Sequence, residues 1–473
     1  MAGTAEKTAN FISVPVHQRQ PRCRQHGRVS IPKALLWTCL TIASFLSLVF
    51  LSPFNPFESS DIRSDTGTLS ETPLETCAWT ALEPHVSLLA VPSIRRPEFL
   101  ARQSRLADAL EDAGVDAFIA EPSASSEYYA NISATFELSE RPFLMIIDKT
   151  GQFAYLVPTF EAGRIAGLDM VYGGEKKVIA WREEESPYEV LATATGYRKV
   201  MLDEHVRYMI AAGLQGAGVE VVPMTERIQS LRSAKTDDEI VILKAINAFT
   251  LELVRALQQC IAVGVAQETV TTVARSLFTR AGVGRGFWSI VLFGDQAAYP
   301  HGGKTGRTLQ DGEFVLVDIG SALHGYGSDV TRTFLPAGAS ASDELLGIWR
   351  TVHASQAAAF ARMRANETCA DVDAASRVPV EEAGYGQFYT HRLGHGLGLE
   401  MHEHPYLNGA NKEKLRLGQV ASNEPGIYVT TEQARQLLGR DVGFGVRLED
   451  PILVTENGGV ALTGHRANSP YDP

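Results

Sequence analysis

Cysteine is scarce in this sequence, and no two cysteines have a spacing typical of a metal site. The 473 residues contain five cysteines, namely Cys23, Cys39, Cys77, Cys260 and Cys369. Because no two of them form a CxxC pair, we expect no thiolate metal site. A disulfide between Cys260 and Cys369 is one pairing that the sequence permits without deciding it. A GxGxxG segment and a P-loop are also absent from the sequence, so no motif supports nucleotide binding.

Positive charge is scarce as well. The formal net charge is -12 at pH 7, which argues against a general nucleic-acid partner. The basic residues gather at one end, where residues 1–33 hold six Lys and Arg side chains against one acid, Glu6. The composition, with 45% hydrophobic and 21% charged residues, is that of an ordinary globular protein. The length predicts about two or three domains.

One uncharged hydrophobic run lies near the N-terminus, at residues 34–51. At ~1.5 Å per residue, a helix of this length is near the lower limit for a ~30 Å hydrocarbon core. A basic segment precedes the run and an acidic one follows it. The positive-inside rule therefore predicts a transmembrane signal anchor at 34–52, with residues 1–33 as a cytosolic tail. A cleaved signal peptide and a buried core helix are the alternatives, and the long basic segment and the charge asymmetry argue against them.

This arrangement predicts a single-pass type II membrane protein whose larger, C-terminal part is lumenal or extracellular. Residues 53–90 are predicted to be a flexible stalk, because few of them are apolar in any regular period. Two sequons, at Asn131 and Asn366, are compatible with this location, although such triplets also arise by chance.

Residues 91–235 predict an α/β domain. An amphipathic helix is expected over 102–114, with Gly114 at its end. The expected strands lie at 116–120, 141–148 and 199–203. Strands that alternate with helices in this way are typical of an α/β domain.

Residues 236–473 predict a second domain, of the α+β class. It begins with a long helix over 237–260, where Thr236 and Glu239 form a capping box. Apolar residues recur every three or four positions along this helix. The strands expected after it do not alternate regularly with helices, which favours an antiparallel sheet packed against helices.

Two aspartates mark the strands of this second domain. Asp318 lies at the end of the apolar run 314–320, where an acid is costly to bury without a partner charge or a metal. Asp329 follows after a turn-rich segment, so a hairpin can place the two carboxylates side by side. Adjacent carboxylates repel each other unless protons or cations lie between them.

Four histidines lie close together in the segment 391–405. The glycines between them allow the backbone to pass close to a site. His395 is the best candidate for a metal ligand. His391 and His402 are candidates for contacts with the substrate or with the ligands, and a surface segment without function is the less favoured interpretation.

Two glutamates complete the set of candidates. Glu424 precedes Pro425 and Gly426, which impose a turn that orients its carboxylate. Glu449 lies within an apolar strand, and Arg447, two residues earlier, shares its face of the strand. A structural Arg447–Glu449 salt bridge is the alternative to a functional role for this pair.

Together these residues predict a metal site made of four carboxylates and one imidazole. Its ligands are Asp318, Asp329, His395, Glu424 and Glu449. Such a set suits Mn²⁺, Zn²⁺ or Co²⁺, and its many oxygen ligands favour Mn²⁺. Four carboxylates can bridge two divalent ions, which activate water and polarise a carbonyl. The predicted chemistry is amide hydrolysis without a covalent enzyme intermediate.

In order and context, these five residues resemble the metal ligands of the pita-bread metallopeptidases, peptidase family M24. This family includes methionine aminopeptidase, aminopeptidase P, prolidase and creatinase. The resemblance is carried by SDVTRTF, HGLGLEMHE, SNEPGIY and VRLEDPILVT, and RSAKTDDEIVILKAI resembles the helix that opens the catalytic domain. The first domain resembles the creatinase/prolidase N-terminal domain. Methionine aminopeptidases lack such a domain, so the resemblance favours the proline-specific branch.

The resemblance also implies a role for each candidate residue. Asp329 and Glu449 would bridge two metals, and Asp318 would bind one of them. His395 and Glu424 would bind the other metal, and Glu424 would also act as the general base.

Four further residues match positions on the substrate side of such a site. His301 and His402 correspond to histidines that contact the substrate and stabilise the tetrahedral intermediate or its leaving group. By the same physics, both could donate hydrogen bonds to charge that develops in the transition state. His391 and Arg447 correspond to substrate-side positions.

The sequence therefore predicts a peptidase that hydrolyses an Xaa-Pro bond, either at the N-terminus of peptides or in dipeptides. The choice between aminopeptidase P and prolidase stays open. The expected cofactors are two divalent metal ions, and the expected partners are a proline-containing peptide and, through residues 34–52, a membrane. The resemblance also implies a homodimer. The alternative functions are a small-amide hydrolase of a specialised pathway and a peptide-binding module.

Overall fold

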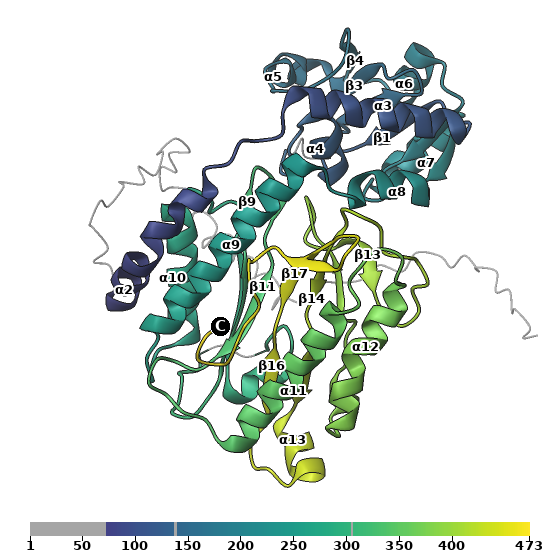
Figure 1. The fold of residues 1–473 in the computed structure, drawn as a ribbon. Coiled ribbons are helices and arrows are strands. Elements are labelled where there is room, and N and C mark those ends of the chain that lie inside the picture. The colour runs from purple at the N-terminus through teal and green to yellow at the C-terminus, as the bar shows by residue number, and fades with distance from the viewer. Residues whose placement is uncertain (1–71, 137–139, 304–305) are drawn as a thin grey trace, which may run out of the picture. The chain divides into compact units, whose positions relative to one another are not determined.

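The computed structural model describes residues 72–136, 140–303 and 306–473 (Figure 1). The predicted transmembrane anchor at 34–52 and the basic tail at 1–33 lie outside these residues. Within the described part of the chain, no helix is long and apolar enough to cross a membrane.

Two short helices precede the N-terminal domain. They are α2 (Pro73–Leu82) and η1 (Glu83–Leu89). Leu82 is fully buried, among apolar side chains of α9 (Asp237–Cys260). The prediction of a flexible stalk is therefore wrong for residues 73–89, because their apolar side chains pack on a helix of the catalytic domain. The earlier residues of the predicted stalk lie outside the described part.

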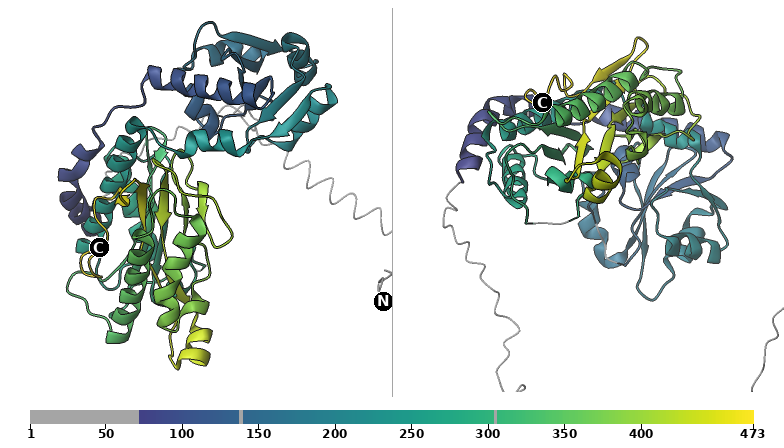
Figure 2. Two further views of the ribbon diagram at one scale, coloured as in Figure 1. Left: turned by 45° about the vertical axis from the view of Figure 1, so that its right-hand side comes forward. Right: turned by 90° about the horizontal axis from the view of Figure 1, so that it is seen from below.

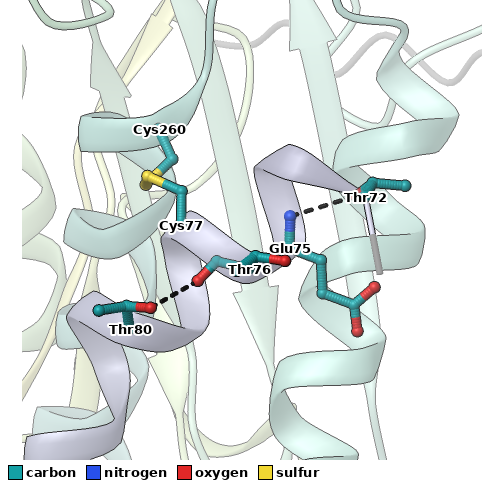
Figure 3. The surroundings of a disulfide bond; sticks show 6 residues. All are labelled: Thr72, Glu75, Thr76, Cys77, Thr80 and Cys260. Carbon is teal, nitrogen blue, oxygen red and sulfur yellow. Dashed lines mark hydrogen bonds between the residues drawn. A yellow bond between two sulfur atoms is a disulfide. The ribbon is translucent and has the colours of Figure 1, made fainter. Parts of the chain in front are cut away.

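A disulfide joins α2 to the C-terminal end of α9 (Figure 3). Cys77 and Cys260 are 183 residues apart in the sequence, and their Cα atoms are 5.9 Å apart. Thr72 caps α2 through a 3.2 Å hydrogen bond that its Oγ1 accepts from Glu75 N. Cys369 is buried and has a free thiol. The pairing of Cys260 with Cys369 is therefore wrong, because α2 places Cys77 beside Cys260.

The N-terminal domain contains a six-stranded sheet in the order β4-β3-β2-β1-β5-β6. Its strands are β1 (Ala117–Ala120), β2 (Leu144–Asp148), β3 (Phe153–Pro158), β4 (Lys177–Trp181), β5 (Lys199–Leu202) and β6 (Glu220–Pro223). Neighbouring residues of β1 belong to different apolar clusters, Phe118 to one and Ile119 to the other, because successive side chains of a strand point to opposite faces.

Helices cover both faces of this sheet. The longer ones are α3 (Arg96–Asp112), α6 (Pro187–Thr195), α7 (Tyr208–Gly216) and α8 (Glu226–Ser233). Leu106 of α3 and Ile228 of α8 pack in the cluster of Phe118, whereas Leu191 of α6 and Ile210 of α7 pack in the cluster of Ile119. The prediction of an α/β domain is confirmed.

The catalytic domain is built from antiparallel strands and four long helices. The larger sheets have the orders β11-β8-β7 and β13-β12-β14-β17-β18, and β15 pairs with β16. The strands around the site are β7 (Trp288–Phe293), β8 (Val315–Gly320), β11 (Val330–Phe334), β12 (Gly394–Gly396), β13 (Glu403–Leu407), β14 (Val420–Asn423), β15 (Gly426–Val429), β16 (Phe444–Arg447) and β17 (Asp450–Val454), and β18 (Gly459–Ala461) is the edge strand beside β17. The prediction of an α+β domain is confirmed.

The four helices lie on two sides of these strands, as Figures 1 and 2 show. Side chains of α9 and α10 (Gln267–Arg280) share an apolar cluster with β7 and β8. On the other side, α11 (Asp343–Phe360) packs against β15 and β16, and α12 (Cys369–Glu382) packs near β14 and β17. The strands between the helices carry the polar residues of the site.

Candidate metal centre

One cavity of the catalytic domain, of about 920 Å³, brings the predicted site residues together. Its walls include Asp318, Asp329, His395, Glu424, Glu449, His301, His391, His402 and Arg447. These are the five predicted ligands and the four predicted substrate-side residues. Their common location is a finding of the structure, whereas the role of each remains a prediction.

The two aspartates come from neighbouring strands. β8 and β11 are antiparallel, and Asp318 on β8 pairs in register with Thr331 on β11. Asp329 directly precedes β11. The expected arrangement of two strands with adjacent carboxylates is therefore present, and the turn-rich residues between the strands form a further small hairpin, β9 (Ala322–Leu323) with β10 (Tyr326–Gly327).

His395 lies at the centre of the short strand β12, between two glycines that the fold requires. A Cβ atom at Gly394 would collide with the carbonyl oxygen of Ser422, and a Cβ atom at Gly396 would collide with that of His404. The glycines thus let β12 lie close to its neighbours, which places His395 between β13 and β14.

The ring of His395 is oriented through both of its nitrogens. Nδ1 lies 3.1 Å from the carbonyl oxygen of Gly396, which leaves Nε2 to face the carboxylates. Nε2 is 3.2 Å from Glu424 Oε1 and 3.6 Å from Asp329 Oδ2. A carbonyl that holds one ring nitrogen while the other faces acids is typical of a histidine that binds a metal.

Two carboxylate oxygens in the cavity are buried without a hydrogen-bond donor from the described residues. They are Asp318 Oδ1 and Glu449 Oε1. The second oxygen of each group is satisfied, because Thr331 donates to Glu449 Oε2 at 2.6 Å and Arg447 donates to Asp318 Oδ2 at 2.5 Å. The expected alternative, an Arg447–Glu449 salt bridge, is therefore wrong, since Arg447 reaches across to β8.

Burial and mutual repulsion disturb the titration of these acids. Burial raises the pKa of Asp318, and burial together with the charges of other acids raises the pKa of Asp329 and Glu449 well above their usual values. Burial would also raise the pKa of Glu424, but the hydrogen bond and charge of His395 lower it to about 2. Three acids thus resist ionisation unless a positive charge enters the cavity.

These observations fit divalent metal ions. One ligand atom from each of Asp329, His395 and Glu449 lies within 4.8 Å of the others. Asp318 and Glu424 add further oxygen atoms on the wall of the same cavity. A set of hard oxygen ligands with one imidazole suits divalent cations, and such cations would meet the two oxygens that lack a donor.

Three histidines surround the ligands. The centre of the His402 ring lies 4.0 Å from the centre of the His395 ring. Burial together with nearby positive charge lowers the pKa of His402 to about 4. His391 Nε2 lies 2.9 Å from the hydroxyl of Tyr428, and burial lowers the pKa of His391. His301 lies on the same cavity wall.

Comparison with known proteins agrees with this geometry. The profile described as metallopeptidase family M24 matches residues 242–456, and the creatinase/prolidase N-terminal domain matches residues 102–234. An uncharacterized peptidase of Schizosaccharomyces pombe is 41% identical over 394 residues, which cover 80% of this chain and 84% of that protein. This chain belongs to metallopeptidase family M24.

Solved structures show the same two-domain arrangement. Dipeptidase PepE from Mycobacterium ulcerans superposes with a TM-score of 0.71 at 26% identity, covering 80% of this chain and 98% of that one. An Xaa-Pro dipeptidase from Bacillus anthracis superposes with a TM-score of 0.64 at 27% identity, covering 78% and 98%. The protein is thus an M24 hydrolase with a creatinase-type N-terminal domain, and its family implies divalent metal ions and peptide substrates.

The M24 site has further wall residues that the sequence did not single out. They include Trp288, Tyr299, Arg392 and Met401. The hydroxyl of Tyr428 lies near the wall and accepts a 3.0 Å hydrogen bond from Arg447 Nη1. Arg392 and Met401 lie within the histidine-rich segment, so their proximity to the site could have been inferred. Tyr299 lies two residues before His301, so its proximity could have been inferred as well, whereas Trp288 comes from a part of the chain without a recognisable motif.

The N-terminal domain of this M24 protein holds the segment that carries His402. Arg232, at the end of α8, pairs with Glu400, and Lys235 pairs with Glu403. Glu403 Oε2 also lies 3.6 Å from Arg232 Nε. We call these four residues, Arg232, Lys235, Glu400 and Glu403, the interdomain clamp. Its two glutamates flank His402 in the sequence, so we expect these ion pairs to restrain His402 relative to the metal ligands.

Proposed function

We propose that this protein is a dinuclear-metal peptidase that hydrolyses the Xaa-Pro bond of peptides, with Mn²⁺ as its metal. The observation that carries the proposal is the buried group of four carboxylates and one imidazole, in which Asp318 Oδ1 and Glu449 Oε1 meet no donor among the described residues. Five such ligands suffice for two divalent ions, and their predominance of oxygen favours Mn²⁺.

The side chains of the site can perform the proton transfers of this reaction. When bound, divalent ions supply Lewis-acid activation of water and of the peptide carbonyl. Glu424, whose pKa is about 2, is ionised at neutral pH and can accept the proton of the attacking water. His402, whose pKa is about 4, is neutral there and can donate its ring N–H to the oxygen that gains charge.

The preference for proline is supported by the relatives. The N-terminal part matches the creatinase/prolidase domain, and one structural neighbour is an Xaa-Pro dipeptidase. The disulfide between Cys77 and Cys260 supports an oxidising compartment, as expected for a type II membrane protein whose catalytic part is lumenal or extracellular.

The test is to assay the purified full-length chain, loaded in turn with Mn²⁺, Zn²⁺ and Co²⁺. The substrates are Xaa-Pro dipeptides, Xaa-Pro-Xaa tripeptides and matched peptides with alanine in place of proline. We expect cleavage at Xaa-Pro with the highest rate in Mn²⁺. Cleavage of the alanine peptides alone would contradict the proline preference.

A Glu424→Gln variant separates a hydrolase from a peptide-binding module. Loss of a general base lowers kcat by about 10²- to 10⁴-fold, whereas a binding module would keep its affinity for peptides. If the parent and the variant both bind metal but neither cleaves any of the peptides, the small-amide hydrolase or the binding module is favoured.

A further inference from the structure

Asn247 is a buried polar residue in the apolar part of α9. It is fully buried, and it directly follows Ile246, which belongs to the apolar cluster that α9 shares with β7 and β8. Asparagine is unfavourable inside a helix, because its amide competes with the helix for hydrogen bonds. A buried amide at this position therefore needs partners of its own.

Both polar atoms of the Asn247 amide have a partner. Nδ2 donates to the carbonyl oxygen of Leu243, one turn earlier in α9, at 2.8 Å. Oδ1 accepts a 3.0 Å hydrogen bond from the backbone N–H of Asp329. The reverse orientation of the amide would set donor against donor and acceptor against acceptor. Oδ1 is therefore held toward Asp329.

Among the five candidate metal ligands, Asp329 depends most on its backbone for its position. The other four each have a hydrogen-bond partner, namely Thr331 for Glu449, Arg447 for Asp318, Ser422 for Glu424 and the carbonyl oxygen of Gly396 for His395. In the part of the chain that the structure describes, no donor bonds to the carboxylate of Asp329, and His395 Nε2 is 3.6 Å from its Oδ2. Because only two torsions join this carboxylate to its backbone, a fixed backbone restricts where it can point.

The strand that follows Asp329 is tied to α9 at both of its ends. Asp329 directly precedes β11, and Leu335 directly follows it. Gln258, a buried residue in the last turn of α9, donates from Nε2 to the carbonyl oxygen of Leu335 at 3.0 Å. Asn247 and Gln258 thus make the same kind of contact with the backbone, but only Asn247 makes it at a candidate metal ligand.

We propose that Asn247 is a positioning residue of the metal centre. It fixes the backbone of Asp329 and so sets the position from which that carboxylate reaches the cations. Asn247 does not line the cavity, so it acts through Asp329. This inference rests on the dinuclear-metal hydrolysis proposed above and adds a residue on which the geometry of that centre depends. Groups that orient metal ligands typically contribute about 10- to 100-fold to metal affinity.

The test measures Mn²⁺ binding to the full-length protein after a chelator has removed its metal. Isothermal titration calorimetry gives the Kd for Mn²⁺ without any peptide cleavage. We expect Asn247→Leu, which keeps the branched shape but has no acceptor, to raise this Kd about 10- to 100-fold. Asn247→Ala removes the same acceptor without adding an apolar branch, and it gives the same measurement if Asn247→Leu disturbs folding.

Gln258→Met is the matched control. It removes a buried hydrogen bond from the same helix to the backbone at the other end of β11. Urea unfolding of the chelated proteins reports the general loss of stability in each variant. We expect the Kd for Mn²⁺ to stay at the value of the parent in Gln258→Met, whatever stability that variant loses, because its contact lies away from Asp329.

The outcomes separate this inference from the proposed function. A Kd equal to that of the parent in Asn247→Leu and Asn247→Ala, or an equal rise of the Kd in Gln258→Met, would overturn the positioning role alone. A parent that binds no Mn²⁺ would overturn the proposed metal centre and the positioning role with it.

Discussion

Two clusters of buried acidic side chains in this protein differ in the number of positively charged side chains around them. In the metal cavity, four carboxylates share one arginine, Arg447, and two of their oxygens meet no donor among the described residues. In the interdomain clamp, Glu403 Oε1 pairs with Lys235, and Glu403 Oε2, which also accepts no hydrogen bond from the described residues, lies 3.6 Å from Arg232 Nε. Both groups belong to the same catalytic domain.

The difference shows how to recognise a binding site among buried charges. In the clamp, the cost of removing charges from water is offset by partners that the chain itself supplies. In the metal cavity the chain supplies too few positive charges, so bound cations must offset that cost. Neither acidity nor an oxygen without a donor separates the two groups, whereas the number of cationic side chains that the chain supplies for each acid does.

The largest expected effect comes from removing one acid of the metal cavity. Asp329→Asn keeps the shape of the side chain but weakens the binding of the ions. We expect kcat/KM to fall about a thousandfold, because bound ions supply several kcal/mol of transition-state stabilisation. Metal content measured on the same preparation should fall in parallel, and a variant that retains both metal and activity would contradict the assignment.

The next effect concerns the clamp. Glu403→Gln leaves Lys235 buried without its acid, so we expect the free energy of unfolding to fall by about 3 kcal/mol. Urea unfolding measures this change, with Glu413→Gln, a glutamate outside the clamp, as the control. An unchanged free energy of unfolding would show that the ion pairs of the clamp do not offset the cost of burying their charges.

A smaller effect, of opposite sign, is expected for Asp329→Asn in the metal-free protein. Burial and the charge of Asp318 raise the pKa of Asp329 above its usual 3.8, so the folded state loses stability as the pH rises from that value through the raised pKa. The variant lacks this acid and avoids the loss. In a chelator, we expect it to be more stable than the parent by about 1–2 kcal/mol above this range.

This comparison is made as the difference between variant and parent across a pH series. The contributions of the neighbouring histidines then largely cancel. The difference should be near zero below about pH 4, where Asp329 is protonated in both states, and should grow as the pH rises. A difference that shrinks with rising pH would contradict the raised pKa of this acid.

The smallest expected effect lies at the edge of the clamp. Glu400 pairs with Arg232 and, at 2.5 Å, with His205, but it is less buried than Glu403. We expect Glu400→Gln to lower kcat a few-fold, about 1 kcal/mol or less, through a less restrained His402. KM and metal content should stay unchanged, and a loss of metal would instead place Glu400 in the ligand system.

Local sequence patterns predicted the helices and the site residues that lie within those patterns. The capping box at Thr236 begins α9 where expected, with Glu239 accepting a 2.9 Å hydrogen bond from Thr236 N. The helix expected at 102 begins instead at Arg96, because Pro97 is favoured in the first turn of a helix. The nine site residues could be identified because their motifs surround them.

Contacts between distant parts of the chain could not be predicted in this way. The periodicity of a strand placed Arg447 beside Glu449, but only the approach of β8 shows that its partner is Asp318. The same holds for Cys77, whose partner lies 183 residues away. The interdomain clamp likewise depends on how α8 meets the histidine-rich segment, which no local pattern encodes.

The disulfide between α2 and α9 has a consequence for proteolysis. Its loop spans 183 residues and includes the whole N-terminal domain. A single protease cut anywhere between Cys77 and Cys260 therefore leaves the two fragments covalently joined, and they separate on a gel only after reduction. A cut before Cys77, in contrast, would release the catalytic part from everything that precedes it.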